Sequence, residues 1–176
     1  MLSITQSIQD EGKKTIPLNS MFCLPIIPRL QRMFALIHTT QQMTWHYENK
    51  NQGVLCHPFG GEAYKNFDRK HQSFASYPHN ILLGLCSGGF NPYIQASFSS
   101  YYCWPVIVTP YNLPPKMCMT MNFMFLTCLI PGSSNLKASI DAYFEPLIDD
   151  LNKLWKAILT YDVSRKQNFL IRATLM

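Results

Sequence analysis

The feature of this sequence that most constrains its fold is a change in hydrophobic periodicity near residue 80. Three runs rich in β-branched, aromatic and apolar residues follow that point, at 81–87, 101–111 and 119–130. They are separated by turn residues, namely Gly88-Gly89, Asn91-Pro92 and Leu113-Pro114-Pro115. Connections of this length suit antiparallel neighbours, so the sequence predicts a meander of three strands.

Prolines affect the strand predictions for the second and third runs. Because proline has no backbone N–H to donate to a sheet, Pro105 and Pro110 predict that part of the second run is an edge strand or is bulged. The third run, "MTMNFMFLTCLI", is too short to span a bilayer, and Pro131-Gly132 is expected to end it. This run is therefore interpreted as a core strand.

A long amphipathic helix is predicted after the three runs. Its apolar residues recur on one side of the helix, while most of its acidic residues lie opposite, as expected of a solvated face rather than a metal site. Pro146 falls inside this pattern and predicts a kink or a restart. The apolar residues are Ile140, Tyr143, Phe144, Leu147, Ile148, Leu151, Leu154, Trp155 and Ile158.

The chain before the strands has helical character. Residues 1–12 are polar and predict a disordered lead, and residues 13–79 predict a helical region that precedes the core. Pro28 suits the first turn of one short helix, and Thr39 has the spacing of a capping box for a second. A third short helix is predicted at 62–71.

The predicted order of elements is helices followed by β-β-β-α-β, with the last strand in "QNFLIRATLM". This order indicates an α+β fold, and it is the order of the first half of a ribonuclease-H-like nuclease, although other α+β domains share it. Residues 80–176 are then a partial ribonuclease-H-like core, truncated at its fourth strand. Such folds carry one carboxylate on the first strand and another at the end of the fourth, where two metal ions activate water for phosphodiester attack.

Charge and cysteine content favour an intracellular protein. The net charge of +5, from 15 basic and 10 acidic residues, permits contact with nucleic acid but does not require it. No secretory signal is visible, so the six cysteines, which form no Cys-x-x-Cys pair, are interpreted as buried free thiols. His46, Cys56 and His57 match no zinc-binding spacing.

Several unusual segments occur in a fixed order along the chain. They include "GVLCHPFGGEAYKNFD", "FASYPHNILLGLCSGGFNPY", "WPVIVTPYNLPPKMCM" and "AYFEPLIDDLNKLW". From about Lys13 to Met176 the chain resembles the central region of plant CACTA-type (En/Spm-like) transposases. The resemblance implies a family that moves DNA elements by cut-and-paste, with an acidic triad and a divalent metal on a ribonuclease-H-like core.

The resemblance gives Gly88 a specific meaning. The family's strand reads like "LGLATDGFNPF", and its Asp is interpreted as the first metal-binding carboxylate. Alignment of the flanking residues, 83–85 and 89–92, puts Gly88 at that position. A hard divalent cation needs anionic oxygen ligands, and glycine supplies none. Without the resemblance, Ser87-Gly88-Gly89 is interpreted simply as a hairpin turn.

Further departures from the family pattern are expected to leave the chain without the other catalytic carboxylates. Members continue past "LIRATLM" into a segment resembling "WTINDFPAYG", interpreted as bearing the second carboxylate, and this chain ends at Met176 before it. Tyr77 and His79 stand where the family favours Asp and Arg. The resemblance therefore implies a transposase-derived fragment of the DDE type that is catalytically inactive. No catalytic residue and no bound metal are expected here, whereas intact members use Mg²⁺.

Two other hypotheses remain open at this point. One is a retained non-catalytic module that binds DNA or a protein, and the other is an active nuclease, which would nick plasmid DNA with Mg²⁺. The expected partners are DNA, bound weakly, and other copies of the chain through exposed sheet edges, with no membrane and no small-molecule substrate. A functional protein would act in the nucleus. The candidate DNA contacts are Arg29, Arg32, Lys65, Arg69 and Lys70.

Overall fold

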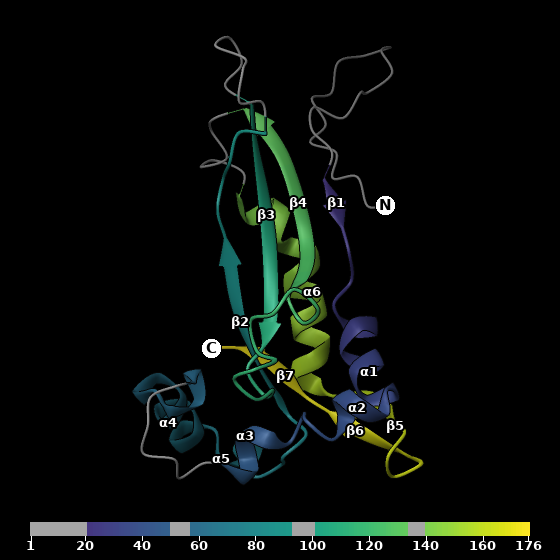
Figure 1. Cartoon of the computed structure of the whole chain (residues 1–176). Coiled ribbons are helices and arrows are strands. Elements are labelled where there is room, and N and C mark those ends of the chain that lie inside the picture. Colours follow the sequence, from purple (N-terminus) through teal and green to yellow (C-terminus); the bar gives the residue numbers. More distant parts are fainter. Residues whose placement is uncertain (1–20, 50–56, 93–100, 134–139) are drawn as a thin grey trace.

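A computed structural model of the chain describes residues 21–49, 57–92, 101–133 and 140–176. Within these ranges the chain combines a five-stranded mixed sheet, a separate two-stranded sheet and several helices, which confirms the predicted α+β class. Figure 1 shows the long strands standing upright, with helix α6 alongside them and the shorter helices near their lower end. The expected disordered lead, residues 1–12, lies outside the described ranges.

The three apolar runs form the predicted antiparallel meander. It consists of β2 (Ile81–Ser87), β3 (Tyr101–Pro110) and β4 (Phe125–Ser133). Two short strands flank the meander, so that the order in the sheet is β1-β4-β3-β2-β7. Strand β1 (Phe22–Cys23) is antiparallel to β4, and β7 (Ala173–Leu175) is parallel to β2.

Strand β3 is central in the sheet, so the interpretation of the second run as an edge strand is wrong. The predicted bulge is confirmed, because the pairing of β3 with β4 shifts register between Val106 and Ile107, directly after Pro105. A proline can occupy a central strand where the ladder is already interrupted. The bulge therefore explains how the sheet tolerates this proline.

The third run differs from the prediction at both of its ends. Residues 119–124 form turns rather than strand, and Met119 has a φ of 63°, in the left-handed region. At the other end, β4 continues through Pro131 and Gly132, which pair with β3. Strand β1 reaches only as far as Leu129 on the opposite side of β4. Beyond that residue the outer side of β4 has no partner among the described residues, and there proline is tolerated.

Helix α6 (Ile140–Lys156) runs through Pro146 without a restart and packs against β4 and β7. It ends before Ile158, contrary to the predicted stripe, because Ala157 has a φ of 117°, which a helix does not allow. Its residues Tyr143, Leu147 and Leu154 are buried. The helix therefore covers the sheet with part of the predicted apolar face, whereas Ile140, Ile148 and Trp155, which the pattern also assigns to that face, are exposed.

The segment after α6 contains a hairpin that the sequence pattern does not predict. Strands β5 (Ile158–Asp162) and β6 (Gln167–Ile171) pair antiparallel in their own two-stranded sheet. The single last strand interpreted from "QNFLIRATLM" is therefore wrong, since this stretch is divided at Arg172 between β6 and β7. Figure 1 shows the hairpin next to α1 and α2, away from the upper end of the meander.

Before β2 the described residues contain several short helical elements as well as β1, and their boundaries differ from those predicted. Thr39 does not cap a helix, because its hydroxyl donates to the backbone carbonyls of Met33 and Leu36 from within α2. The helix expected after a Thr39 cap is therefore wrong, and two short helices lie on either side of a turn instead. The helical elements are α1 (Ile27–Ala35), α2 (Ile37–Thr40), α3 (Trp45–Glu48), η1 (Pro58–Gly60), α4 (Glu62–Lys70) and α5 (Gln72–Ala75).

Strand β2 separates two apolar clusters. Ile81 and Leu83 lie in the main core with residues of α1, β3, β4 and α6. Leu82 belongs to a second cluster with Phe59, Tyr64 and Phe74. Since successive side chains of a strand point to opposite faces, the first half of β2 is buried on both sides. This half is the anchor of the fold.

The described cysteines are free thiols, as predicted, but their burial varies. Cys118 and Cys128 are buried, whereas Cys86 is exposed, so the interpretation of all cysteines as buried is wrong. Cys23 and Cys128 face each other across β1 and β4, with their Sγ atoms 3.3 Å apart. Burial and the neighbouring Cys23 thiol raise the pKa of Cys128 to about 12. The Cys128 thiol is therefore protonated and unreactive at neutral pH.

Candidate functional site

Gly88 directly follows the last residue of β2 and is exposed. A Cβ atom added at Gly88 would meet no described atom within 4 Å outside its chain neighbours, and its φ lies outside the left-handed region. A glycine is needed where a side chain would clash or where φ is positive. Neither reason applies at Gly88, so its surroundings leave room for a side chain.

Two neighbouring glycines have a clear structural reason. A Cβ at Gly84 would lie 2.0 Å from the Tyr111 hydroxyl oxygen, and a Cβ at Gly89 would lie 2.6 Å from the Trp104 ring. Each of these glycines lets an aromatic side chain pack directly on the strand backbone. Gly88 lies between them in the sequence but has no such neighbour.

Strand β7 approaches the same end of the sheet. It pairs with β2 in parallel, with Leu83 opposite Leu175, and the Met176 N–H donates to the Leu83 carbonyl at 3.0 Å. The direction of β7 therefore leads toward Gly88. Within the ranges that the structure describes, no three His, Cys, Asp or Glu side chains lie close enough together to hold a metal ion.

Arg29 and Arg32, two of the five candidate DNA contacts, lie along one groove. The groove has a volume of about 530 Å³ and separates α1 from the segment that leads into β4. The guanidinium of Arg29 lies over the Phe125 ring, 5.9 Å from its centroid. None of the described residues that line this groove is acidic. Its lining residues are Arg29, Arg32, Met33, Leu36, Thr39, Asn122, Phe123 and Phe125.

The other three candidates lie on α4. Lys65 and Arg69 are within 3.1 Å and 3.8 Å of the Glu62 carboxylate, and all three side chains are exposed. Lys70 ends the helix. Figure 1 shows α4 and α1 on opposite sides of the lower part of the molecule, so the predicted contacts form two surfaces rather than one.

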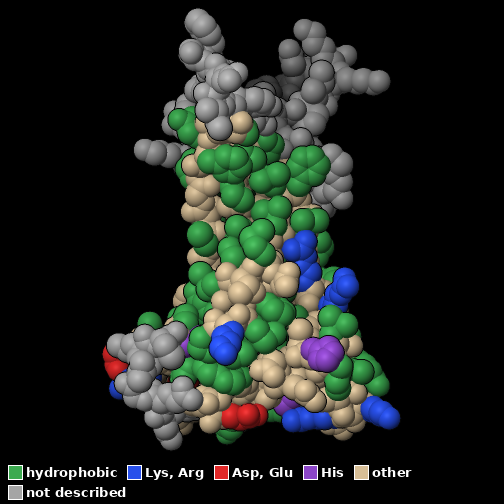
Figure 2. Space-filling model, in the orientation of Figure 1, with side chains coloured by type: hydrophobic (Ala, Val, Ile, Leu, Met, Phe, Trp, Pro, Cys, Tyr) green, Lys and Arg blue, Asp and Glu red, His purple; other side chains and the backbone are tan. Residues whose placement is uncertain are grey.

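The two surfaces differ in their surroundings. The positive charge on α4 is partly neutralised by Glu62, whereas the groove beside α1 is lined by two arginines and no carboxylate. Figure 2 shows basic side chains on the right of this face, at about the height of α1, while the acidic side chains in view lie lower. The positive charge of the groove is therefore less compensated by neighbouring carboxylates than that of α4, and it would attract an anion more strongly.

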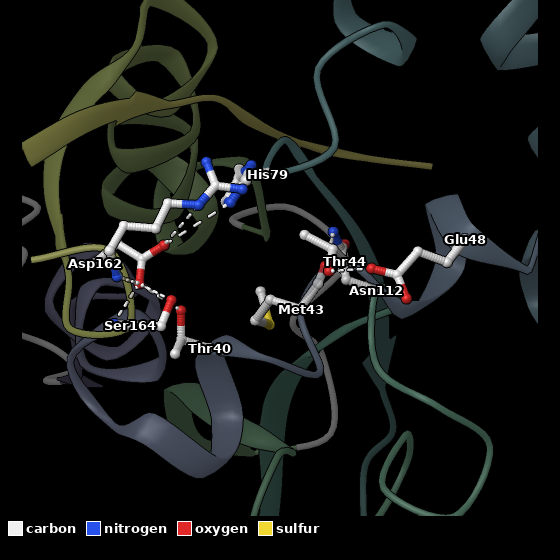
Figure 3. Close-up of polar contacts among 9 residues, drawn as sticks. Thr40, Met43, Thr44, Glu48, His79, Asn112, Asp162 and Ser164 are labelled. Carbon is white, nitrogen blue, oxygen red and sulfur yellow. Dashed lines mark hydrogen bonds and ion pairs between the residues drawn. The ribbon is translucent and has the colours of Figure 1, made fainter. Parts of the chain in front are cut away.

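A buried carboxylate, which the sequence pattern does not single out, lies at the opposite end of β2 from Gly88. Asp162 is 1% exposed and ends β5. Its Oδ1 accepts hydrogen bonds from the Thr40 hydroxyl at 3.1 Å and from the Ser164 hydroxyl and N–H at 2.6 and 2.8 Å. Figure 3 shows these groups around Asp162, with His79 facing it. Asp162 thus joins α2 to the hairpin.

Charge in this cluster is balanced locally. Burial alone would raise the pKa of Asp162, but the hydrogen bonds from Ser164 and Thr40 outweigh it and hold this pKa below its usual value. His79 Nε2 lies 3.9 Å from Asp162 Oδ2, and Arg165 Nε lies 3.7 Å from the same oxygen. Burial, followed by the nearby Arg165, lowers the pKa of His79 despite the Asp162 charge. The cluster therefore combines an ionised Asp162 with a neutral His79.

A second polar group fixes the start of β2. Asn112 is fully buried, accepts from the Leu82 N–H at 3.2 Å, and donates to the carbonyls of Met43 and Asn80 at 3.2 and 2.8 Å. Asn80 in turn accepts from the Arg172 N–H at 3.0 Å. These bonds tie the helical region, β2 and the start of β7 together, which is a structural role.

The sheets and helices described above define an α+β fold. A comparison with protein families then identifies the family to which the chain belongs. The model of the transposase family tnp2 matches residues 52–176. The chain therefore belongs to this transposase family. No curated protein and no solved structure matches it.

No helix within the described ranges is both long enough and apolar enough to cross a bilayer.

Proposed function

We propose that this transposase-derived protein is of the CACTA and DDE type and that its sheet is half of a ribonuclease-H-like core. The strand arrangement supports this proposal. Three antiparallel strands lead, after helix α6, into a strand parallel to the first of them, in the order β4-β3-β2-β7. Strand β7 runs parallel to β2, with Leu175 opposite Leu83, so its direction leads toward the end of β2 where Gly88 lies. Such a fold needs its first carboxylate at that end of β2.

We further propose that the protein performs no metal-dependent cleavage of DNA. The observation that carries this proposal is Gly88, whose position offers space for a side chain but supplies only backbone. A two-metal site needs carboxylate oxygens to hold its ions about 4 Å apart. Intact members of the family would hold Mg²⁺ here through an Asp.

A plasmid-nicking assay tests this proposal. The purified protein is incubated with supercoiled plasmid and either Mg²⁺ or Mn²⁺, and relaxed circles are quantified over time. We expect no relaxation above the level of a mock purification. Nicking that requires the metal, is removed by a chelator and co-elutes with the protein would contradict the proposal.

A second function, contact with DNA in the nucleus, is supported by the groove beside α1. Arg29 and Arg32 line it without a neighbouring carboxylate, so an anionic phosphate backbone meets uncompensated positive charge there. We expect weak binding that decreases as salt increases. A gel-shift titration at several salt concentrations tests this proposal. An affinity that does not change with salt concentration would argue against phosphate contact.

We also propose self-association through an open sheet edge. Strand β7 pairs with β2 only along Ile81–Leu83, so the outer side of Leu85–Ser87 has no strand partner within the described residues. Such an edge exposes backbone groups that another strand can pair with. Light scattering on a concentration series should show a mass that increases with concentration, and a constant monomer mass would refute this proposal.

A further inference from the structure

The groove beside α1 has a composition that a purely structural groove does not need. Two arginines of α1, Arg29 and Arg32, and two partly buried phenylalanines, Phe123 and Phe125, line it together. Its volume of about 530 Å³ is within the range of sites that hold small ligands, about 300–1,000 Å³. The groove is therefore large enough to take one or two planar ring systems.

We propose that this groove binds an unpaired, single-stranded segment of nucleic acid, with the arginines at phosphates and the phenyl rings at bases. The proposal rests on the DNA contact proposed above and specifies its substrate class. Proteins that bind single strands combine positive charge along the backbone with aromatic side chains on which bases stack. Both parts of that combination line this groove.

The contacts of Arg29 favour this occupant. Its guanidinium lies 5.9 Å from the Phe125 ring centroid, so a cation and an aromatic face are already held together at the groove wall. A base that enters here meets a phenyl ring, and its phosphate meets a guanidinium on the adjacent turn of α1. Among the described residues, Arg32 makes no hydrogen bond or ion pair, and α1 buries its opposite side through Leu30 and Phe34.

The same geometry argues against a duplex and against an acidic peptide as the occupant. In a duplex the bases are stacked on one another and paired, so their faces are closed to the phenyl rings. An acidic peptide would satisfy the arginines but would leave Phe123 and Phe125 without planar partners. The rings therefore distinguish the proposed ligand from other anions.

Fluorescence anisotropy with the full chain tests this proposal. The probes are a labelled 15-nucleotide oligo-dT and a labelled duplex of the same length, each at two salt concentrations. The variants are Arg29→Gln/Arg32→Gln, Phe123→Leu, and Lys65→Gln/Lys70→Gln, which removes the same charge from the competing candidate surface on α4. Circular dichroism establishes that each variant is folded.

We expect the single strand to bind more tightly than the duplex. The arginine double variant should lose tenfold or more in affinity for the single strand, and Phe123→Leu about tenfold, while the α4 variant changes it less than threefold. Phe123→Leu keeps the charge and an apolar side chain, so a loss confined to the single strand identifies stacking.

Three outcomes would overturn this inference, and they separate it from the broader proposal. Equal binding of both probes, weakened equally by the arginine variant, would leave DNA contact standing and remove the single-strand site. Loss caused only by the α4 variant would move the contact to α4. Absence of binding to either probe by the unaltered protein would refute both proposals.

Discussion

The two ends of strand β2 differ sharply. At its start, Asn112 and Asn80 bind the backbone on both sides, and the Asp162 cluster lies next to His79. At its end, Leu85–Ser87 are exposed and Gly88 contributes no side chain. The first end contains buried hydrogen bonds that hold the fold together, and the second contains the position at which we propose that the family's first metal ligand is replaced by glycine. Under the function proposed above, the chain retains the interactions that hold the sheet at one end of β2 and lacks a metal ligand at the other.

The largest effect is expected from Asn112→Ala. This change leaves the Leu82 N–H and two carbonyls without their partner in a fully buried place. Since an unsatisfied buried group costs about 1–3 kcal/mol, we expect the free energy of unfolding to fall by about 3–4 kcal/mol. Urea denaturation measures it, with exposed Asn152→Ala on α6 as the control. A decrease in the free energy of unfolding of less than about 1 kcal/mol would contradict the claim that these hydrogen bonds hold the start of β2 in place.

Asp162→Ala should have the next largest effect. Thr40 loses its buried acceptor, while Ser164, which is exposed, can turn to water. We expect a loss of about 2–3 kcal/mol, measured by the same denaturation, whereas exposed Asp149→Ala should change stability by less than about 0.5 kcal/mol. Equal effects of the two changes would show that the Asp162 cluster does not hold α2 to the hairpin.

The glycines at the other end sharpen the comparison. Gly84→Ala places a Cβ 2.0 Å from the Tyr111 hydroxyl and must displace that ring, so we expect a loss of about 1–2 kcal/mol. The Cβ that Gly88→Ala or Gly88→Asp adds meets no described atom within 4 Å, so either change should alter stability by about 0.5 kcal/mol or less. A large loss at Gly88 would mean that the fold itself requires this glycine.

A further effect, smaller than those of the Asn112 and Asp162 changes, is a dependence of stability on pH near the start of β2. Burial lowers the pKa of His79 and of His57 from 6.5, so in the pH range just below 6.5 the unfolded chain binds protons that the folded chain does not. Stability therefore falls as pH decreases through 6.5. For one histidine the loss at pH 5.5 is at most about 1.4 kcal/mol. His79→Gln should reduce this slope, and an unchanged slope would contradict the assignment.

The parts of the fold with a strong single periodicity could be predicted from the sequence. The run at 81–87 is apolar and is followed by two glycines, and 140–156 repeats apolar residues at helical spacing, so the type of each element follows from its local pattern. The β5–β6 hairpin has no such signal. Leu159, Tyr161 and Leu170 are exposed, so burial does not follow the pattern of hydrophobicity. The end of α6 depends on the φ of Ala157, which no sequence pattern indicates.

Only one part of the candidate site, the position of Gly88, could be predicted from the sequence. The family resemblance singles out Gly88, but the open space around it depends on the positions of Tyr111 and Trp104 on other strands. The groove depends on α1 lying beside Phe123 and Phe125, which are far from it in the sequence. Asp162 could have been noticed, because Asp followed by Ser two residues later between apolar strands is typical of a turn closed by the carboxylate.

The central claim is that the end of β2 lacks the ligand for a divalent ion. Titration of the purified chain with Mn²⁺, followed by electron paramagnetic resonance of the free ion, tests it most directly. We predict no saturable site below millimolar Mn²⁺ in the unaltered chain. A single site with a micromolar dissociation constant, weakened when bulk is added by Gly88→Leu, would contradict the account.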